Sequence, residues 1–187
     1  MSTLSDLAAA AQDLARLVRD MALDPADAIR LLTPLAACAA DQAAAGDAIG
    51  RAMTAAQAAS AALCRRAALA ELGRAVAQAE PRSWDETVQL RDQVCALLDA
   101  EIIVAADAGE DRSYAALRGL RDAVARRLNA KAGGLPRLRT VEVPQAEPAL
   151  VQAFRLYGDV TRADEVSAYA AAEDPNFIVG TFMVRGA

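Results

Sequence analysis

Alanine holds most of the apolar positions in the first part of this 187-residue chain, and it dominates the stretch from Leu35 to Ala79. Alanine favours helices because it loses no side-chain entropy there, but each alanine buries little area against a neighbour. Hydrophobic residues make up 55% of the chain and aromatic residues only 4%, so large core side chains are few. These features predict a mostly α-helical protein whose long helices pack closely or are stabilised by partners.

The charge balance and the missing residue types limit the classes of function. The formal net charge is −5, and Lys131 is the only lysine. A protein whose main ligand is nucleic acid usually carries a basic excess, so nucleic acid is not expected in that role. The chain has no histidine, the commonest acid–base catalyst and a common zinc ligand. We therefore expect a protein that is not an enzyme and that has no metal and no cofactor.

The cysteines and the apolar runs limit the classes of protein further. Cys38, Cys64 and Cys95 stand far apart and lack a CxxC spacing, so they are interpreted as small buried hydrophobic residues. No apolar run approaches the roughly eighteen residues that a membrane helix needs. The first residues lack the basic and apolar regions of a signal peptide. The sequence therefore predicts neither a membrane span nor a signal peptide.

Residues 1–80 are expected to form an alanine-rich helical arm. The first helix is predicted over residues 3–22, because its apolar residues recur at intervals of three and four. Its expected buried stripe is Leu4, Leu7, Ala11, Leu14, Leu17 or Val18, and Met21. Asp24 and Pro25 have the residue types of a helix start. One or two long helices should follow up to Ala79, with Gly46 and Gly50 as breaks.

Residues 81–187 are expected to form a helical domain with a C-terminal helix hairpin and an apolar tail. Ser83 and Glu86 have the spacing of a capping box, which predicts a helix start there. The helix that follows, over about 84–106, is apolar over more than half of its surface and should be central. The next helix is predicted to bury Tyr114, Leu117, Leu120, Val124 and Leu128.

A helix hairpin is predicted between residues 147 and 172. Pro148 suits the start of its first helix and Gly158 suits the end. Leu150, Phe154 and Tyr157 are spaced to form a buried stripe, which we expect to pack against the helix that holds Leu117 and Val124. A short β element is expected near residues 138–143 and/or 176–184, on either side of this hairpin.

The apolar tail after Pro175 offers a candidate partner contact. Its large apolar side chains are Phe177, Ile178, Val179, Phe182, Met183 and Val184. Two interpretations are open. The tail either folds back on its own domain or adds a strand to a neighbouring subunit, with residues 140–143 as a second strand.

Two charged clusters are also candidates. A polar contact face for phosphate or an acidic partner would be formed by Arg118, Arg121, Arg126 and Arg127. The alternative for these arginines is a solvated outer face that is partly paired with nearby acids. The acidic group comprises Asp99, Glu101, Asp107, Glu110 and Asp111. It lacks the spacing of a calcium loop, and its last three members are interpreted as solvating a turn.

Two segments carry a resemblance to a known family. They are "WDETVQLRDQVCALLDAEIIVAADAGEDRSYAALRGLRDAVARRLNAKAGGLPRL" and, further on, "PALVQAFRLYGDVTRADEV". Together they resemble the C-terminal region of the Mu-like phage DNA circularisation (DNA circulation) proteins, over roughly residues 65–180. The chain departs from the family in lacking its distinct N-terminal domain and in ending on "FIVGTFMVRGA" instead of a glycine-rich stretch.

The resemblance implies a structural or assembly component of a phage-like contractile tail, in the baseplate or tube-end region. Its implied partners are other tail and baseplate proteins, with which it would be oligomeric, in a virion assembled in the cytoplasm of the bacterial host. The alternative is a tail-assembly chaperone or adaptor that sheathes a helical partner and is absent from the mature particle.

Overall fold

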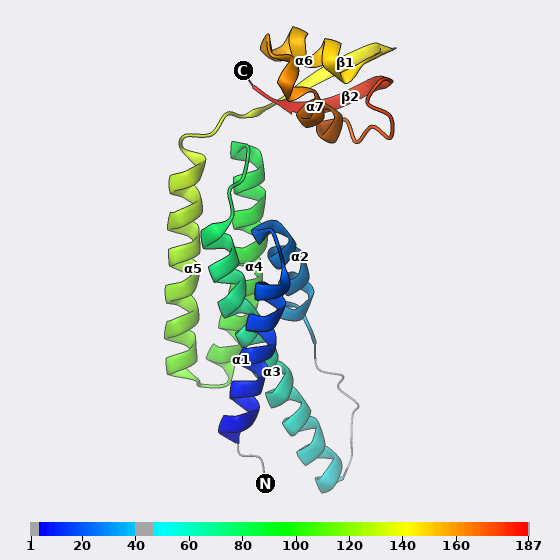
Figure 1. Ribbon diagram of the computed structural model, residues 1–187. Coiled ribbons are helices and arrows are strands. Elements are labelled where there is room, and N and C mark those ends of the chain that lie inside the picture. Colours follow the sequence, from blue (N-terminus) through cyan, green and yellow to red (C-terminus); the bar gives the residue numbers. More distant parts are fainter. Residues whose placement is uncertain (1–3, 40–46, 187) are drawn as a thin grey trace. The chain divides into compact units, whose positions relative to one another are not determined.

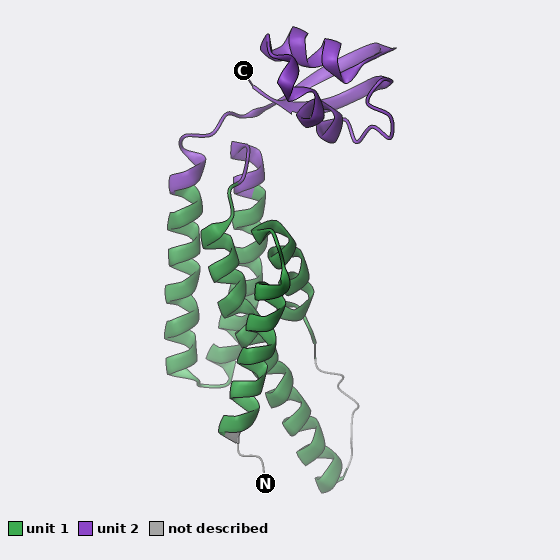
Figure 2. Cartoon of the chain, viewed as in Figure 1, with its two compact units in different colours: residues 1–80, 89–129 green, residues 81–88, 130–187 purple. Residues whose placement is uncertain are grey.

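The computed structural model describes residues 4–39 and 47–186, and it divides the chain into two compact units (Figure 2). Unit 1 comprises residues 1–80 and 89–129, and unit 2 comprises residues 81–88 and 130–187. The predicted fold class is confirmed, because the chain is mostly helical and carries one short antiparallel sheet (Figure 1). The expected division after residue 80 differs from the observed one, which groups residues 89–129 with the alanine-rich segment.

Five helices supply unit 1: α1 (Leu4–Met21), α2 (Pro25–Ala36), α3 (Ala48–Gln78), and most of α4 (Trp84–Asp107) and α5 (Asp111–Ala132). Helices α2 and α3 each begin at an aspartate that caps the first turn. The side chain of Asp24 accepts a hydrogen bond from the Ala26 amide, and that of Asp47 accepts one from the Gly50 amide, at 2.8 and 2.9 Å. Gly50 therefore lies inside the first turn of α3 and does not break it. Gly46 lies outside the described residues.

The core of unit 1 combines a few large side chains with many alanines. Its fully buried leucines are Leu32, Leu69, Leu72, Leu98 and Leu128, which come from α2, α3, α4 and α5. Between them lie alanines of α3 such as Ala68 and Ala75. Small residues let helices approach closely: a Cβ built on Gly73 would lie 2.7 Å from Cδ1 of Leu120 in α5. Alanine and glycine thus set the helix spacing, while the leucines supply most of the buried area.

The expected buried stripe of α1 is wrong at Leu7, Leu14 and Met21, and the side chain of Leu4 lies outside what the structure describes. Ala11 and Ala15 are buried and Val18 is half-buried, in the same core cluster as α3. The larger side chains Leu7, Leu14, Leu17 and Met21 are exposed. The apolar stripe covers about half of the helix circumference, and only its alanine half packs on the core. The leucine half is left open, and nothing in the spacing of the residues distinguishes the two halves.

Unit 2 is built on two antiparallel strands, β1 (Leu138–Glu147) and β2 (Ile178–Arg185). Between them the chain forms α6 (Ala149–Tyr157), a short 3₁₀ helix (Val160–Arg162) and α7 (Ala163–Tyr169). Val141 pairs with Phe182 and Val143 with Gly180, after which the register shifts before Glu147. The tail therefore folds back on its own chain, with residues 140–143 in the partner strand. This is the first of the two interpretations of the tail.

The first turn of α4 belongs to unit 2 and is tied to the entry into β1. Ser83 caps the helix as expected, because the Glu86 amide donates to Ser83 Oγ, while the Glu86 carboxylate accepts from the Arg82 amide, one residue before the cap. The Leu138 amide donates to Asp85 at 2.7 Å, and the Trp84 amide donates to the Pro136 carbonyl at 3.0 Å. These bonds hold the residues before β1 against the start of α4.

The buried face of α6 is not the predicted one. Phe154 is 62% exposed, Leu150 is also exposed and Tyr157 is only half-buried. The helix instead buries Ala149, Gln152 and Ala153, so its closest packing again uses small residues. Leu117 and Val124, against which this stripe was expected to pack, belong to the core cluster of unit 1. Gly158 ends α6 in the left-handed conformation, φ 69°, as predicted.

Candidate functional site

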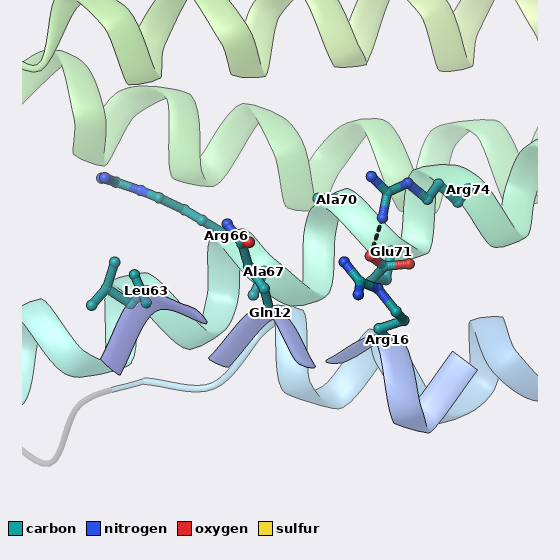
Figure 3. A pocket seen from close by; sticks show the side chains of 9 residues that line it. Gln12, Arg16, Leu63, Arg66, Ala67, Ala70, Glu71 and Arg74 are labelled. Carbon is teal, nitrogen blue, oxygen red and sulfur yellow. Dashed lines mark hydrogen bonds and ion pairs between the residues drawn. The ribbon is translucent and has the colours of Figure 1, made fainter. Parts of the chain in front are cut away.

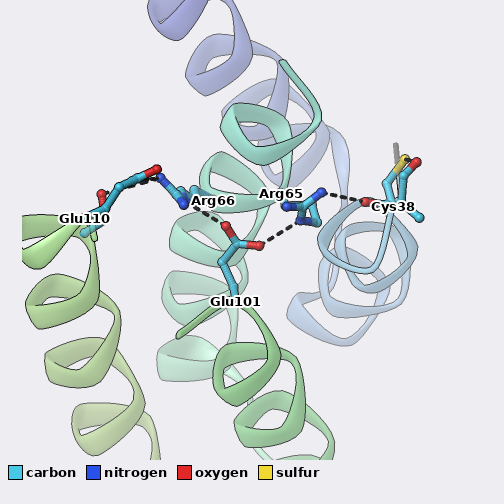
Figure 4. Close-up of polar contacts among 7 residues, drawn as sticks. Cys38, Arg65, Arg66, Glu101 and Glu110 are labelled. Atoms are coloured by element: carbon cyan, nitrogen blue, oxygen red, sulfur yellow. Dashed lines mark hydrogen bonds and ion pairs between the residues drawn. The ribbon is translucent and has the colours of Figure 1, made fainter. Parts of the chain in front are cut away.

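Two buried glutamates of unit 1 are each held by two arginines. Glu101 in α4 is 3% exposed, and its two carboxylate oxygens accept hydrogen bonds from Arg65 Nε at 2.8 Å and from Arg66 Nε at 2.7 Å (Figure 4). Arg65 also donates to the Cys38 carbonyl, and Arg66 also donates to the Glu110 carboxylate. The network therefore ties the end of α2, the middle of α3 and the end of α4 to the start of α5.

The second buried glutamate, Glu71 in α3, accepts hydrogen bonds from Arg19 of α1 and from Arg74. It lies beside a cavity of about 220 Å³ that is lined by side chains of α1 and α3, among them Gln12, Arg16, Arg66 and Arg74 (Figure 3). Three arginines suggest an anion site, but each already has a carboxylate partner: Arg16 has Asp13, Arg66 has Glu101 and Glu110, and Arg74 has Glu71. The cavity is therefore better explained as part of the packing between α1 and α3.

Three members of the predicted acidic group, Asp99, Glu101 and Glu110, are paired with arginines. Asp99 accepts two hydrogen bonds from Arg121, at 2.6 and 3.1 Å, and the bond from Arg66 lowers the pKa of the Glu110 carboxyl. Within residues 4–39 and 47–186, no group of three metal-ligating side chains comes together. The sequence patterns do not single out Glu71 or Glu101 as structural residues. A signal exists for Glu101, which lies three residues after Leu98 and four before Ala105, on the buried face of α4.

The four arginines of the predicted polar face are on α5, but they do not form one set of free cations. Arg121 is paired with Asp99, and Arg127 donates to the Ala77 carbonyl at 3.4 Å. Arg118 lies over the ring of Tyr114 and contacts its hydroxyl. Arg126 is exposed. This arrangement matches the alternative interpretation, a solvated outer face that is partly paired.

Five of the six apolar residues of the tail lie on the two faces of β2, and Phe177 directly precedes the strand. Ile178 and Val184 are buried in unit 2 and Phe182 is half-buried, because alternate residues of a strand point to opposite faces. Ile178 and Val184 are therefore core residues and not partner contacts, which corrects the prediction for these two. Phe177, Val179 and Met183 are exposed. We call these three residues the tail patch. The sheet contains only β1 and β2 among the described residues, so each strand has an edge without a neighbouring strand.

A charged cluster in unit 2 lies where α7 meets the end of β2. Glu165 in α7 accepts two hydrogen bonds from Arg162, at 2.8 and 3.1 Å, and one from Arg185 in β2 at 3.3 Å. The bonds from Arg162 lower the pKa of the Glu165 carboxyl. Arg162 also lies over the ring of Tyr157 at 3.3 Å, and burial raises the pKa of that phenol. The cluster joins α7 to β2 and pairs the Glu165 carboxylate with two arginines.

The three cysteines differ in exposure. Cys95 is buried, and this burial raises the pKa of its thiol, which disfavours the reactive thiolate. Cys38 and Cys64 are exposed, which is contrary to their interpretation as buried hydrophobic residues.

Neither the family models nor the curated proteins compared with this chain give a match. Across the described part of the chain, no helix is both long and apolar enough to cross a membrane.

Proposed function

We propose that this protein is a structural or assembly component of a phage-like contractile tail, in the baseplate or tube-end region, and that it binds neighbouring virion proteins. The tail patch on unit 2 is the observation that carries the protein-binding role. Val179 and Met183 are apolar and exposed on a small sheet with two open strand edges, and the exposed Phe177 directly precedes β2. Exposed apolar groups beside open strand edges are typical of surfaces that another chain covers.

The assignment to a phage tail rests on the resemblance of the segments around residues 84–138 and 148–166. The partners under this proposal are other tail and baseplate proteins, with which the chain forms an oligomeric assembly in the cytoplasm of the bacterial host. Its role there is to hold proteins together, with no catalytic step. The arginine–glutamate networks support this role, because they join helices to one another and occupy the charged groups that chemistry would use.

The alternative function, an assembly chaperone or adaptor, is favoured by a different observation. The leucines of α1 are open to solvent, as a chaperone that sheathes a helical partner would require. The two functions differ in one respect that can be measured. A structural component remains in purified particles, whereas a chaperone leaves before maturation.

Mass spectrometry of purified, salt-washed particles tests the proposal. We expect the chain to be present at a fixed ratio to other tail proteins. The double variant Val179→Ser, Met183→Ser should lower its incorporation by about tenfold, since two apolar contacts are lost. Val160→Ser is the matched control, because Val160 is also an exposed valine of unit 2 but lies outside the tail patch. Absence of the wild-type chain from the particles would support the chaperone instead. If the wild type, the double variant and the control are incorporated equally, the tail patch is not part of the interface.

A further inference from the structure

The exposed half of the apolar stripe on α1 follows a seven-residue repeat. Leu7, Leu14 and Met21 succeed one another at intervals of seven, and Leu17 lies three residues after Leu14. All four side chains are exposed. This is the spacing of the seam along which one helix packs against another in a coiled coil. We call these four residues the α1 seam.

An acidic row runs along one side of the α1 seam. Asp6, Asp13 and Asp20 each precede a seam residue directly, so they share the same seven-residue interval. All three are exposed. On the other side of the seam lie Ala11 and Val18, which face the core of unit 1. The seam therefore has one flank that is covered by its own unit and one flank that is negatively charged.

The arginines of α1 do not cancel this row. Arg19 contacts Asp20, but its guanidinium also binds the buried carboxylate of Glu71, so one cation serves two anions. Arg16 contacts Asp13 at 3.5 Å from a position further round the helix, away from the seam. The flank keeps a negative character that a partner helix would meet.

We propose that the α1 seam is a docking site for an amphipathic helix of a partner protein whose apolar seam is flanked by lysine or arginine. Residues that flank a coiled-coil seam choose the partner through their charges. A basic flank on the partner helix would pair with Asp6, Asp13 and Asp20 while its apolar side chains cover the leucines. This inference does not depend on the assignment to a phage tail, because it concerns only the kind of partner helix that α1 can bind.

A second copy of this chain fits the site less well. If a second α1 packed along the seam, one of its two flanks would lie opposite the acidic row. One flank is the same acidic row and the other is the face with Ala11 and Val18, so neither offers positive charges to the aspartates. An anionic lipid surface is disfavoured for the same reason, because like charges repel. The charge pattern thus selects a basic helix among the surfaces that could cover the leucines.

Binding of two synthetic peptides to the full chain tests the proposal by fluorescence anisotropy. Each peptide has about three heptads with leucine at both seam positions. One carries lysine at the flanking positions and the other carries glutamate. We expect the lysine peptide to bind at least about tenfold more tightly, and we expect added salt to weaken its binding. The variant Asp13→Lys should reduce or invert this preference.

The apolar part of the site is tested with Leu14→Gln, Leu17→Gln, which should weaken binding of the lysine peptide by about tenfold or more. Leu150→Gln is the matched control, because Leu14 and Leu150 are both 55% exposed on helices but lie in different units. It should change binding by less than about twofold. Circular dichroism of each variant checks that the helices remain folded.

Several outcomes would overturn the proposal. Equal binding of the two peptides, or equal binding by the Leu14→Gln, Leu17→Gln and Leu150→Gln proteins, would show that the seam or its charge plays no part. A wild-type dimer that the seam variant converts to a monomer would assign the seam to a second copy. Seam-dependent binding to phosphatidylcholine vesicles would assign it to a lipid surface. Because no particle enters these assays, their failure leaves the proposed tail function to its own test.

Discussion

The guanidinium of Arg19 in α1 lies 2.5 Å from the carboxylate of Glu71 in α3, where the Glu71 side chain is only 4% exposed. The two residues are 52 positions apart in the chain. A buried carboxylate without a cation is strongly destabilising, so this pair constrains how α1 is placed on α3. The alanines around it add little area of their own, which makes the pair a principal point of attachment for α1.

The variant Arg19→Met should therefore lower the free energy of unfolding by about 1–3 kcal/mol, because it leaves Glu71 with Arg74 as its remaining arginine partner. The matched control is Arg30→Met. Arg30 contacts Asp27 within α2 at 3.0 Å, and both side chains are more than half exposed, so its loss should cost about 0–0.5 kcal/mol. Urea unfolding followed by circular dichroism gives both values. Equal effects of the two variants would mean that the buried pair does not attach α1.

Unit 2 should respond to changes on the inner face of β2 and not on the outer face of α6. Ile178→Ala should cost about 2–5 kcal/mol, because this side chain is fully buried. Phe154→Ala should cost less than about 1 kcal/mol, because most of the Phe154 side chain is already in water. Trp84 is the only tryptophan and lies in unit 2, so its fluorescence can follow the unfolding of this unit. A larger effect for Phe154 would contradict the observed packing of α6.

Gly73 and Gly119, two of the glycines in the helices of unit 1, should differ when they are replaced by alanine. At Gly119 in α5 a Cβ meets nothing within 4 Å, so Gly119→Ala should stabilise the protein by about 0.5–1 kcal/mol through helix propensity. At Gly73 the new Cβ must displace Leu120, which should offset that gain by about 1–3 kcal/mol. Thermal unfolding measures both. If Gly73→Ala stabilises as much as Gly119→Ala does, α3 and α5 are further apart than described.

Stability of unit 2 should depend on the charge of Glu165. The hydrogen bonds from Arg162 hold the pKa of this carboxyl below its ordinary value of 4.5, so the folded state favours the ionised form. The stabilisation is therefore present above pH 4.5 and is lost as the pH falls through the lower, folded-state pKa. Glu165→Gln should be less stable than the wild type near neutral pH, and the difference should shrink as the pH falls. Trp84 fluorescence in urea, recorded across this range, checks it. If the difference in stability between the wild type and Glu165→Gln grows as the pH falls, the folded state does not favour the ionised form of Glu165.

Local signals in the sequence were sufficient for the helix ends. Asp24, the Ser83–Glu86 capping box and Gly158 each act through neighbours a few residues away, so their roles can be inferred without the fold. The same is true of the periodic face of α5, where Leu117, Val124 and Leu128 are buried as predicted.

The choice of buried face on α1 and α6 could not be inferred in this way. On both helices the larger side chains Leu14 and Phe154 are exposed while Ala15 and Ala153 are buried. Burial by hydrophobicity alone favours the larger residue, but a close approach of two helices favours the smaller one. Which of the two effects decides depends on the distance between the helices, and that distance is a property of the whole core. The roles of Glu71 and Glu101 depend on arginines from other segments for the same reason.

Unit 2 draws on two stretches of sequence, and unit 1 contributes residues 89–129 between them. A ribosome makes about 5–20 residues per second, so residues 81–88 wait several seconds before β1 follows them. β1 then waits again until β2 has been made, and over that time its edge has no strand to pair with. Unit 1 receives its last residues earlier in synthesis. Folding on the ribosome should therefore finish in unit 1 first, and the emerging β1 is the part of the nascent chain that most needs protection from aggregation.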